Sequence, residues 1–155
     1  MATTLSAGAK SGGCLCGAVR FTAVPGKQHE FGACHCSMCR KWAAGPFFAV
    51  ECGDTVKVED PSKLGTYKSS EWAERSFCKQ CGTVLFYRLV AMNYYVVSAE
   101  AFDNTAGFVF TNQVFIDEKP AYYDFANKTA SMTGAEVFAL FAPPDQAQDQ
   151  SQGKD

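Results

Sequence analysis

Seven of the eight cysteines fall into three short groups, and this clustering constrains the fold more than any other feature of the chain. The groups lie at residues 14–16, 34–39 and 78–81. Cysteines only one to three positions apart cannot easily bridge each other, but their sulfurs can converge on one metal ion. The spacing therefore favours metal sites that tie distant segments of the chain together.

A reducing compartment strengthens the metal interpretation. The N-terminal segment 1–13 is small and polar and lacks the apolar stretch of a secretory signal. No apolar run approaches the roughly 20 residues of a membrane span. We therefore expect a cytoplasmic protein without membrane association. Cytosolic thiols are kept reduced, and clustered ones bind metal or do chemistry more often than they form disulfides.

The length and the net charge limit the classes of protein to which the chain could belong. The 155 residues suit one domain, and the net charge of −2 offers no basic footprint for nucleic acid. We expect disordered tails at 1–12 and 143–155, where the sequence is small, polar and low in complexity. A single zinc-binding domain would then occupy 13–142. The sequence leaves a homodimer open.

Between the tails the pattern predicts a mostly β fold with short helices. Apolar alternation and runs of β-branched or aromatic residues predict strands at 18–23, 47–50, 55–58, 83–89, 94–98 and 108–116. Short helices are expected at 36–44 and 133–141. Thirteen phenylalanines are consistent with sheet packing.

Counting ligands gives one complete structural site. Zinc in structural sites is tetrahedral with four protein ligands. The first and third groups supply four cysteines, namely Cys14, Cys16, Cys78 and Cys81. Gly82 follows the last of them and can take a positive φ, which bends the backbone so that its amides face the sulfurs. Zinc here would join the start of the domain to its middle and stabilise the fold.

The second group supplies three cysteines, namely Cys34, Cys36 and Cys39. Three protein ligands and an open fourth place are typical of a zinc ion that meets water or substrate. Three soft thiolates suit thiol chemistry better than water activation. Arg40 and Lys41 follow directly and could attract an anionic ligand.

Other groupings and roles stay open at this point. Members of the second group could instead join Cys78 and Cys81, which would leave the first pair reactive. His35 lies between two ligating positions, so its side chain is expected to point away, although it could be a fourth ligand. Cys52 is expected to be a buried, inert thiol, and His29 a solvent-facing or hydrogen-bonded residue. Trp42 and Trp72 could line a pocket, but packing is the expected role of each.

Taken together, the three groups resemble the glutathione-dependent formaldehyde-activating enzyme (Gfa/CENP-V) family. The matching segments are 13–21, 34–41 and 77–83, and 115–123 looks like the family's closing Asp-x-Lys-Pro-x-Trp stretch. Tyr122 stands where the family usually has Trp. The chain also lacks the longer loops and C-terminal extension associated with the glutathione-using member.

The resemblance implies a fold, two metal sites and a reaction. The fold would be an Mss4-like β-tent of small antiparallel sheets stapled by zinc. Two zinc ions per chain are expected, a structural one on the four-cysteine set and a catalytic one, which loses metal more readily, on the three-cysteine set. The implied reaction joins glutathione and formaldehyde to give S-hydroxymethylglutathione, as a carbon–sulfur lyase. Its partners would be a small thiol such as glutathione and an aldehyde.

Two functions from other classes compete with the enzyme. The first is a non-catalytic zinc module that binds another macromolecule, since fold alone does not decide function. The second is a thiol-based redox or zinc sensor, in which the second cysteine group loses its metal on oxidation.

Overall fold

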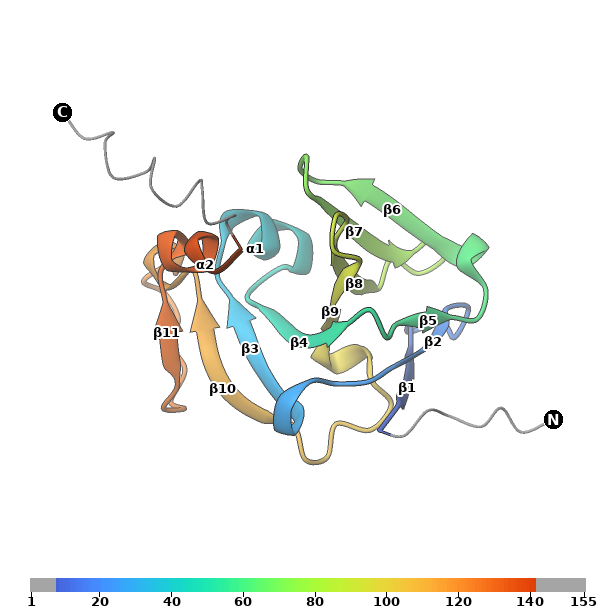
Figure 1. Ribbon diagram of the computed structural model, residues 1–155, viewed down its shortest axis with the longest axis horizontal. Helices are drawn as coiled ribbons and strands as arrows, with labels where there is room; N and C mark the ends of the chain where they lie inside the picture. The colour runs from blue at the N-terminus through green and yellow to red at the C-terminus, as the bar shows by residue number, and fades with distance from the viewer. Residues whose placement is uncertain (1–7, 142–155) are drawn as a thin grey trace.

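The computed structural model describes residues 8–141, which form two β-sheets and two short α-helices (Figure 1). The smaller sheet has the strand order β1-β2-β5, with the bounds β1 Lys10–Gly13, β2 Arg20–Ala23 and β5 Lys57–Val58. The larger sheet has the order β11-β10-β3-β4-β9-β8-β7-β6. Its strands are β3 Glu30–Cys34, β4 Phe47–Gly53, β6 Leu64–Lys68, β7 Ala73–Cys78, β8 Val84–Leu89, β9 Tyr94–Ser98, β10 Val109–Val114 and β11 Ala130–Met132. The expectation of a mostly β fold with short helices is confirmed.

Most neighbouring strands in the larger sheet are antiparallel, but one edge is parallel. Strand β10 pairs in parallel with both β3 and β11. In Figure 1 the orange strands β11 and β10 lie at one edge of the larger sheet beside blue β3, and the green strands β7 and β6 lie at the other edge, above the smaller sheet. The antiparallel part was expected from the sequence, whereas the parallel edge was not.

The core fills the space between the two sheets. Phe21 of β2 stands edge-on to Phe86 of β8 and to Phe102, with ring centroids 5.0 and 5.5 Å apart. Val50 and Val97, which face each other across β4 and β9, are fully buried. These contacts join the smaller sheet to the larger one and hold β4 against β9.

The domain begins earlier than expected. Strand β1 starts at Lys10, inside the segment 1–12 that was predicted to be a disordered tail. Its small residues pair with β2, and the backbone of Gly12 lies against the ring of Phe21, where a Cβ atom would clash. Backbone pairing and close approach therefore order a segment with almost no apolar side chains. The rest of the predicted tails, 1–7 and 143–155, lies outside the described residues.

Both predicted helices are present. Helix α1 spans Ser37–Ala43 and α2 spans Gly134–Phe141. Cys36 caps α1 because its sulfur accepts from the N–H of Cys39, and Ala44 ends the helix in a left-handed conformation. The first turn of α1 is thus fixed by the sulfur of Cys36. Across residues 8–141, neither helix has the length and apolar character that crossing a membrane would require.

Candidate metal centres

The structure gathers the first and third cysteine groups into one cluster. The sulfurs of Cys14, Cys16, Cys78 and Cys81 all lie within 4.8 Å of one another. The Sγ atoms of Cys14 and Cys16 are 3.5 Å apart, and those of Cys16 and Cys78 are 3.8 Å apart. A tetrahedral zinc with Zn–S bonds of about 2.3 Å places its sulfurs about 3.8 Å apart. This four-cysteine cluster therefore fits a closed zinc site.

Backbone amides surround the sulfurs of the four-cysteine cluster. The N–H of Val19 donates to Cys14 Sγ at 3.2 Å. The N–H groups of Gln80 and Cys81 donate to Cys78 Sγ at 3.3 and 3.4 Å. Gly82 has the positive φ expected of it, +79°, and its own N–H closes the turn onto the Cys78 carbonyl. Fixed amide dipoles of this kind stabilise thiolate charge without any charged side chain.

The second group forms a separate cluster. Cys34 ends β3, Cys36 caps α1 and Cys39 lies in its first turn, and their sulfurs all lie within 4.8 Å of one another. The alternative grouping with Cys78 and Cys81 does not occur, because those sulfurs belong to the other cluster. Cys39 is buried, whereas Cys34 and Cys36 are partly exposed, so solvent reaches two of the three residues of the three-cysteine cluster.

Hydrogen bonds within the three-cysteine cluster shift the ionisation of its thiols. The pKa of Cys36 is lowered to about 2, chiefly because Cys34 and Cys39 donate to its sulfur. The pKa of Cys34 rises in return. The N–H of Cys39 also donates to Cys36 Sγ, at 3.3 Å. One negative charge is therefore readily held within the three-cysteine cluster, and a divalent cation would extend ionisation to all three thiols.

His35 does not join the cluster. Its side chain is fully buried, with Nδ1 2.7 Å from the phenolic oxygen of Tyr123 and Nε2 2.8 Å from Oε1 of Gln113. Both ring nitrogens thus have partners, and the ring points away from the sulfurs as its position between two ligands suggested. Its backbone carbonyl accepts from Nε of Arg40 at 2.9 Å, so Arg40 braces the same loop.

The closing segment of the predicted family motif packs against this loop. Tyr123, rather than Tyr122, makes the contact, since the Tyr122 side chain is 81% exposed. Lys119 donates to the carbonyl of Tyr123 at 2.6 Å, and a carboxylate oxygen of Glu118 accepts from the N–H of Ser37 at 3.3 Å. Sequence reasoning singled out the segment but missed Tyr123, because only the fold shows which tyrosine reaches the cysteine loop.

A buried arginine, also missed from the sequence, adjoins the three-cysteine cluster. The Nη1 atom of Arg75 lies 3.4 Å from Cys39 Sγ, and its guanidinium lies over the ring of Trp42. Trp42 itself packs on Phe47. Its indole therefore faces an arginine that contacts a cluster cysteine, and it does more than fill space.

The remaining candidates lie away from both clusters. Cys52 is buried, and burial raises its pKa to about 12, which matches the expected inert thiol. His29 packs edge-on against Phe108, with ring centroids 6.0 Å apart. Trp72 is half exposed and stands edge-on to Phe138 of α2.

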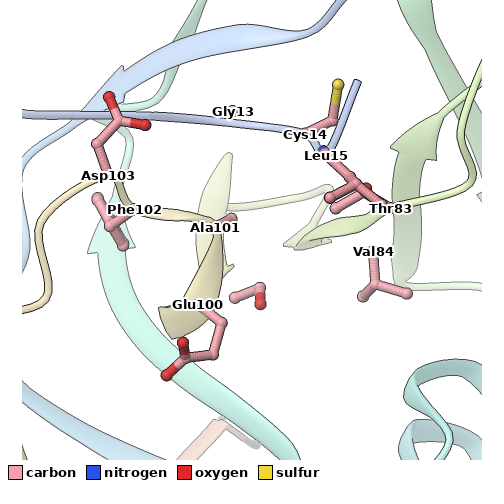
Figure 2. A pocket seen from close by; sticks show the side chains of 10 residues that line it. Gly13, Cys14, Leu15, Thr83, Val84, Glu100, Ala101, Phe102 and Asp103 are labelled. Atoms are coloured by element: carbon pink, nitrogen blue, oxygen red, sulfur yellow. The ribbon is translucent and has the colours of Figure 1, made fainter. Parts of the chain in front are cut away.

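A hollow of about 340 Å³ lies beside the four-cysteine cluster, not beside the three-cysteine one. Figure 2 shows Cys14 and Thr83 on one side of it and Glu100 and Asp103 on the other. Asp103 is paired with Arg20, which lowers the pKa of its carboxyl group. Of the two acidic side chains on its wall, Asp103 is therefore neutralised by Arg20.

Comparison with known proteins agrees with the cysteine pattern. The family model described as "Glutathione-dependent formaldehyde-activating enzyme" matches residues 9–118. An uncharacterized lyase of Schizosaccharomyces pombe is 41% identical over 127 residues, which cover 81% of this chain and 92% of that protein. A Halomonas elongata protein, provisionally named a glutathione-dependent formaldehyde-activating enzyme, is 35% identical over 83 residues, 48% of this chain and 53% of that protein.

A solved structure supports the fold. The crystal structure of a Rhodobacter sphaeroides protein superposes with a TM-score of 0.53 at 22% identity, covering 61% of this chain and 88% of that one. The chain belongs to the glutathione-dependent formaldehyde-activating enzyme family. This confirms the family and the enzyme class expected from the three cysteine groups.

Proposed function

We propose that this family member is a zinc-dependent enzyme of the carbon–sulfur lyase type, which acts on the adduct of a small thiol and an aldehyde. Cys34, Cys36 and Cys39 would hold the catalytic zinc. The four-cysteine cluster would hold a second, structural zinc. Glutathione and formaldehyde are the substrates that the family's name suggests, with S-hydroxymethylglutathione as the adduct.

The geometry of the three-cysteine cluster carries this proposal. Its sulfurs converge within 4.8 Å, and in the described range 8–141 no histidine or acidic side chain joins them as a fourth ligand. His35, the nearest candidate in sequence, has both ring nitrogens bound elsewhere. A site with three protein ligands leaves one place for a substrate, whereas the four-cysteine cluster is complete.

A zinc ion bound there would act as a Lewis acid that favours the ionised form of a thiol and fixes its position. Groups of the protein hold the ligands of this site in position. The N–H of Cys39 holds the sulfur of Cys36, and the His35–Tyr123 contact fixes the loop between the ligands. Fixing the thiol next to the aldehyde converts a bimolecular encounter into a reaction between held groups.

The reaction balances without any oxidant or reductant. In the forward direction the thiol sulfur forms a bond to the aldehyde carbon, the carbonyl π-bond opens, and the thiol proton ends on the aldehyde oxygen. In reverse the carbon–sulfur bond breaks and the proton returns to sulfur. Cys36 is partly exposed, so solvent reaches this residue. Solvent can carry the proton there.

The decisive experiment compares two cysteine variants for adduct formation from glutathione and formaldehyde, followed by NMR. Cys36→Ser removes one ligand of the three-cysteine cluster, and Cys52→Ser removes a thiol that lies outside both clusters. We expect Cys36→Ser to lose at least about 100-fold in rate, since even outer partners of metal ligands contribute 10- to 100-fold. Cys52→Ser should retain its rate once folded.

Other results would point to the rival functions. Undiminished turnover by Cys36→Ser would remove the three-cysteine cluster from the chemistry. A wild-type protein that binds no thiol but releases one zinc under mild peroxide would instead be a sensor. Neither turnover nor peroxide response, with both metals retained, would indicate an interaction module.

A further inference from the structure

Arg75 is a buried cation without an acidic partner. It lies on β7, and its side chain is 5% exposed. None of the three ion pairs found between residues 8 and 141 includes it. Burying an unpaired charge costs several kcal/mol, so a buried guanidinium normally lies against negative charge. Among residues 8–141, the hydrogen bond that its guanidinium donates goes to a cysteine sulfur, that of Cys39.

Two aromatic rings hold the guanidinium in place. Its central carbon lies 5.0 Å from the ring centroids of both Trp42 and Tyr87. Tyr87 is the direct cross-strand neighbour of Arg75 on β8, whereas Trp42 comes from α1, the helix that also carries Cys39. Cation–π contacts strengthen when they are desolvated, and these two hold the guanidinium between the rings while leaving its N–H groups free to bond elsewhere.

That edge faces the three-cysteine cluster. Nη1 lies 3.4 Å from Cys39 Sγ, and Nε is buried with no hydrogen-bond partner. A neutral thiol is a weak acceptor, whereas a thiolate is a strong one. The cation is therefore properly paired only when the cysteines are ionised, which is their state as metal ligands.

The two cysteine clusters differ in the groups that stabilise the negative charge of their sulfurs. The four-cysteine cluster receives backbone amides from Val19, Gln80 and Cys81. The three-cysteine cluster receives a single amide, from Cys39, and the guanidinium of Arg75. In the four-cysteine site, the positive potential has to balance only the four fixed thiolates. The three-cysteine site would also bind an incoming anion, so it needs additional positive potential, and the full charge of Arg75 supplies it.

We propose that Arg75 is a positioning residue that makes the three-cysteine site selective for an anionic thiolate as its fourth ligand. Three thiolates and a divalent zinc sum to one negative charge, which Arg75 neutralises. When a further thiolate binds, the net charge of the site becomes minus one, whereas without Arg75 it would become minus two. The inference rests on the proposed function, since it assigns a cause to thiol binding at that site.

The test uses Arg75→Gln, which keeps hydrogen-bonding atoms but not charge, and Arg75→Lys, which keeps the charge. Arg88→Gln is the matched control, because Arg88 lies on the next strand and is also stacked on a ring, that of Tyr95, at 5.7 Å. Its other partners are Glu74 and Asn93, and no cysteine is among them. Metal affinity is measured by chelator competition with Zn²⁺ and Co²⁺, and glutathione binding by the sulfur-to-cobalt charge-transfer bands.

Arg75→Gln should weaken metal binding at the three-cysteine site by about 10- to 100-fold, the range for outer partners of metal ligands. At saturating Co²⁺ it should also weaken glutathione binding by at least about 10-fold, while Arg75→Lys recovers part of both losses. The four-cysteine site should keep its metal in every variant. Wild-type behaviour of Arg75→Gln, or equal losses in the glutamine and lysine variants, would overturn the proposal.

Two further results separate this inference from the proposed function. If the wild-type protein binds metal at the three-cysteine site but no glutathione, the proposed function fails. If the wild type binds both and the Arg75 variants do too, only the role of Arg75 fails. Should Arg75→Gln lose both metals and unfold, Arg75→Lys decides. Metal and glutathione affinities less than about 10-fold below wild type support charge pairing, and a folded lysine variant with losses as large as those expected for the glutamine variant contradicts it.

Discussion

The phenolic oxygen of Tyr123 lies 2.7 Å from Nδ1 of His35, across 88 positions of sequence. This hydrogen bond joins the cysteine-bearing loop between β3 and α1 to the segment that follows β10. Because His35 is fully buried, its ring nitrogens have no access to water when a partner is removed. The contact therefore fixes the backbone from which the three-cysteine cluster is built.

Replacing Tyr123 with Phe should destabilise the zinc-loaded protein by about 1–3 kcal/mol, the cost of leaving a buried polar group unsatisfied. Chemical unfolding at matched zinc concentration measures the effect. Tyr122→Phe is the control, since its 81% exposed side chain should change stability by no more than about 0.5 kcal/mol. Equal stabilities of the two variants would show that the His35 contact contributes nothing.

The turn at Gly82 gives a prediction about backbone strain. Its φ is +79°, and a Cβ atom added there would meet nothing within 4 Å, so any cost of substitution is conformational. Gly82→Ala should lose about 1–2 kcal/mol of stability, and Gly82→Asn less, since asparagine tolerates the left-handed region better. Thermal unfolding of the zinc form compares them. If alanine proved as stable as glycine, the turn would not require its positive φ.

Burial of Cys52 makes stability depend on pH in a defined window. Burial raises the pKa of this thiol from 9.0 to about 12, so the folded state holds the proton more tightly than the unfolded state. The contribution of the buried, protonated thiol to the free energy of unfolding is therefore complete below pH 9. It is lost as the pH rises towards 12, at up to about 1.4 kcal/mol per pH unit. The stability of a Cys52→Ala variant should therefore fall less steeply between pH 9 and 12 than that of the wild type. If the free energies of unfolding of the two proteins changed in parallel over this range, the burial of Cys52 would not be the cause.

The folded protein should also shield Cys52 from alkylation. At pH 8 a thiol with a pKa of about 12 is almost entirely protonated, and only the thiolate reacts. Iodoacetamide followed by peptide mass mapping should leave Cys52 unlabelled until denaturant is added. Labelling in the native protein at the rate of a free exposed thiol would show that the core opens at this position.

The sequence predicted the parts of the fold whose signals are local. Strands β8 and β9 were expected because β-branched and aromatic residues run through both, and the short helix expected at 36–44 is α1. Strands β1, β3, β6, β7 and β11 were missed. Gly32 and Ala33 give β3 no β-branched pattern, and β7 buries Arg75 and Ser76, residue types that normally mark exposed positions.

The same distinction holds for the candidate sites. Ligand counting predicted the four-cysteine and three-cysteine sets, because closely spaced cysteines leave few ways to complete a tetrahedral site. Arg75 could not be found this way. Its contact with Cys39 spans 36 positions, and its burial depends on Trp42 from one segment and Tyr87 from another. Only the folded chain brings these groups together.

Native mass spectrometry of the purified chain, with and without glutathione, tests the central claim most directly. We predict two zinc ions per chain, matching the two cysteine clusters, and a glutathione adduct on the two-zinc form. Cys36→Ser should show one zinc and no adduct, with its charge-state distribution still that of a folded protein. A wild-type protein with one zinc and no adduct, or a Cys36→Ser variant that retains both, would contradict a thiol-using zinc site at Cys34, Cys36 and Cys39.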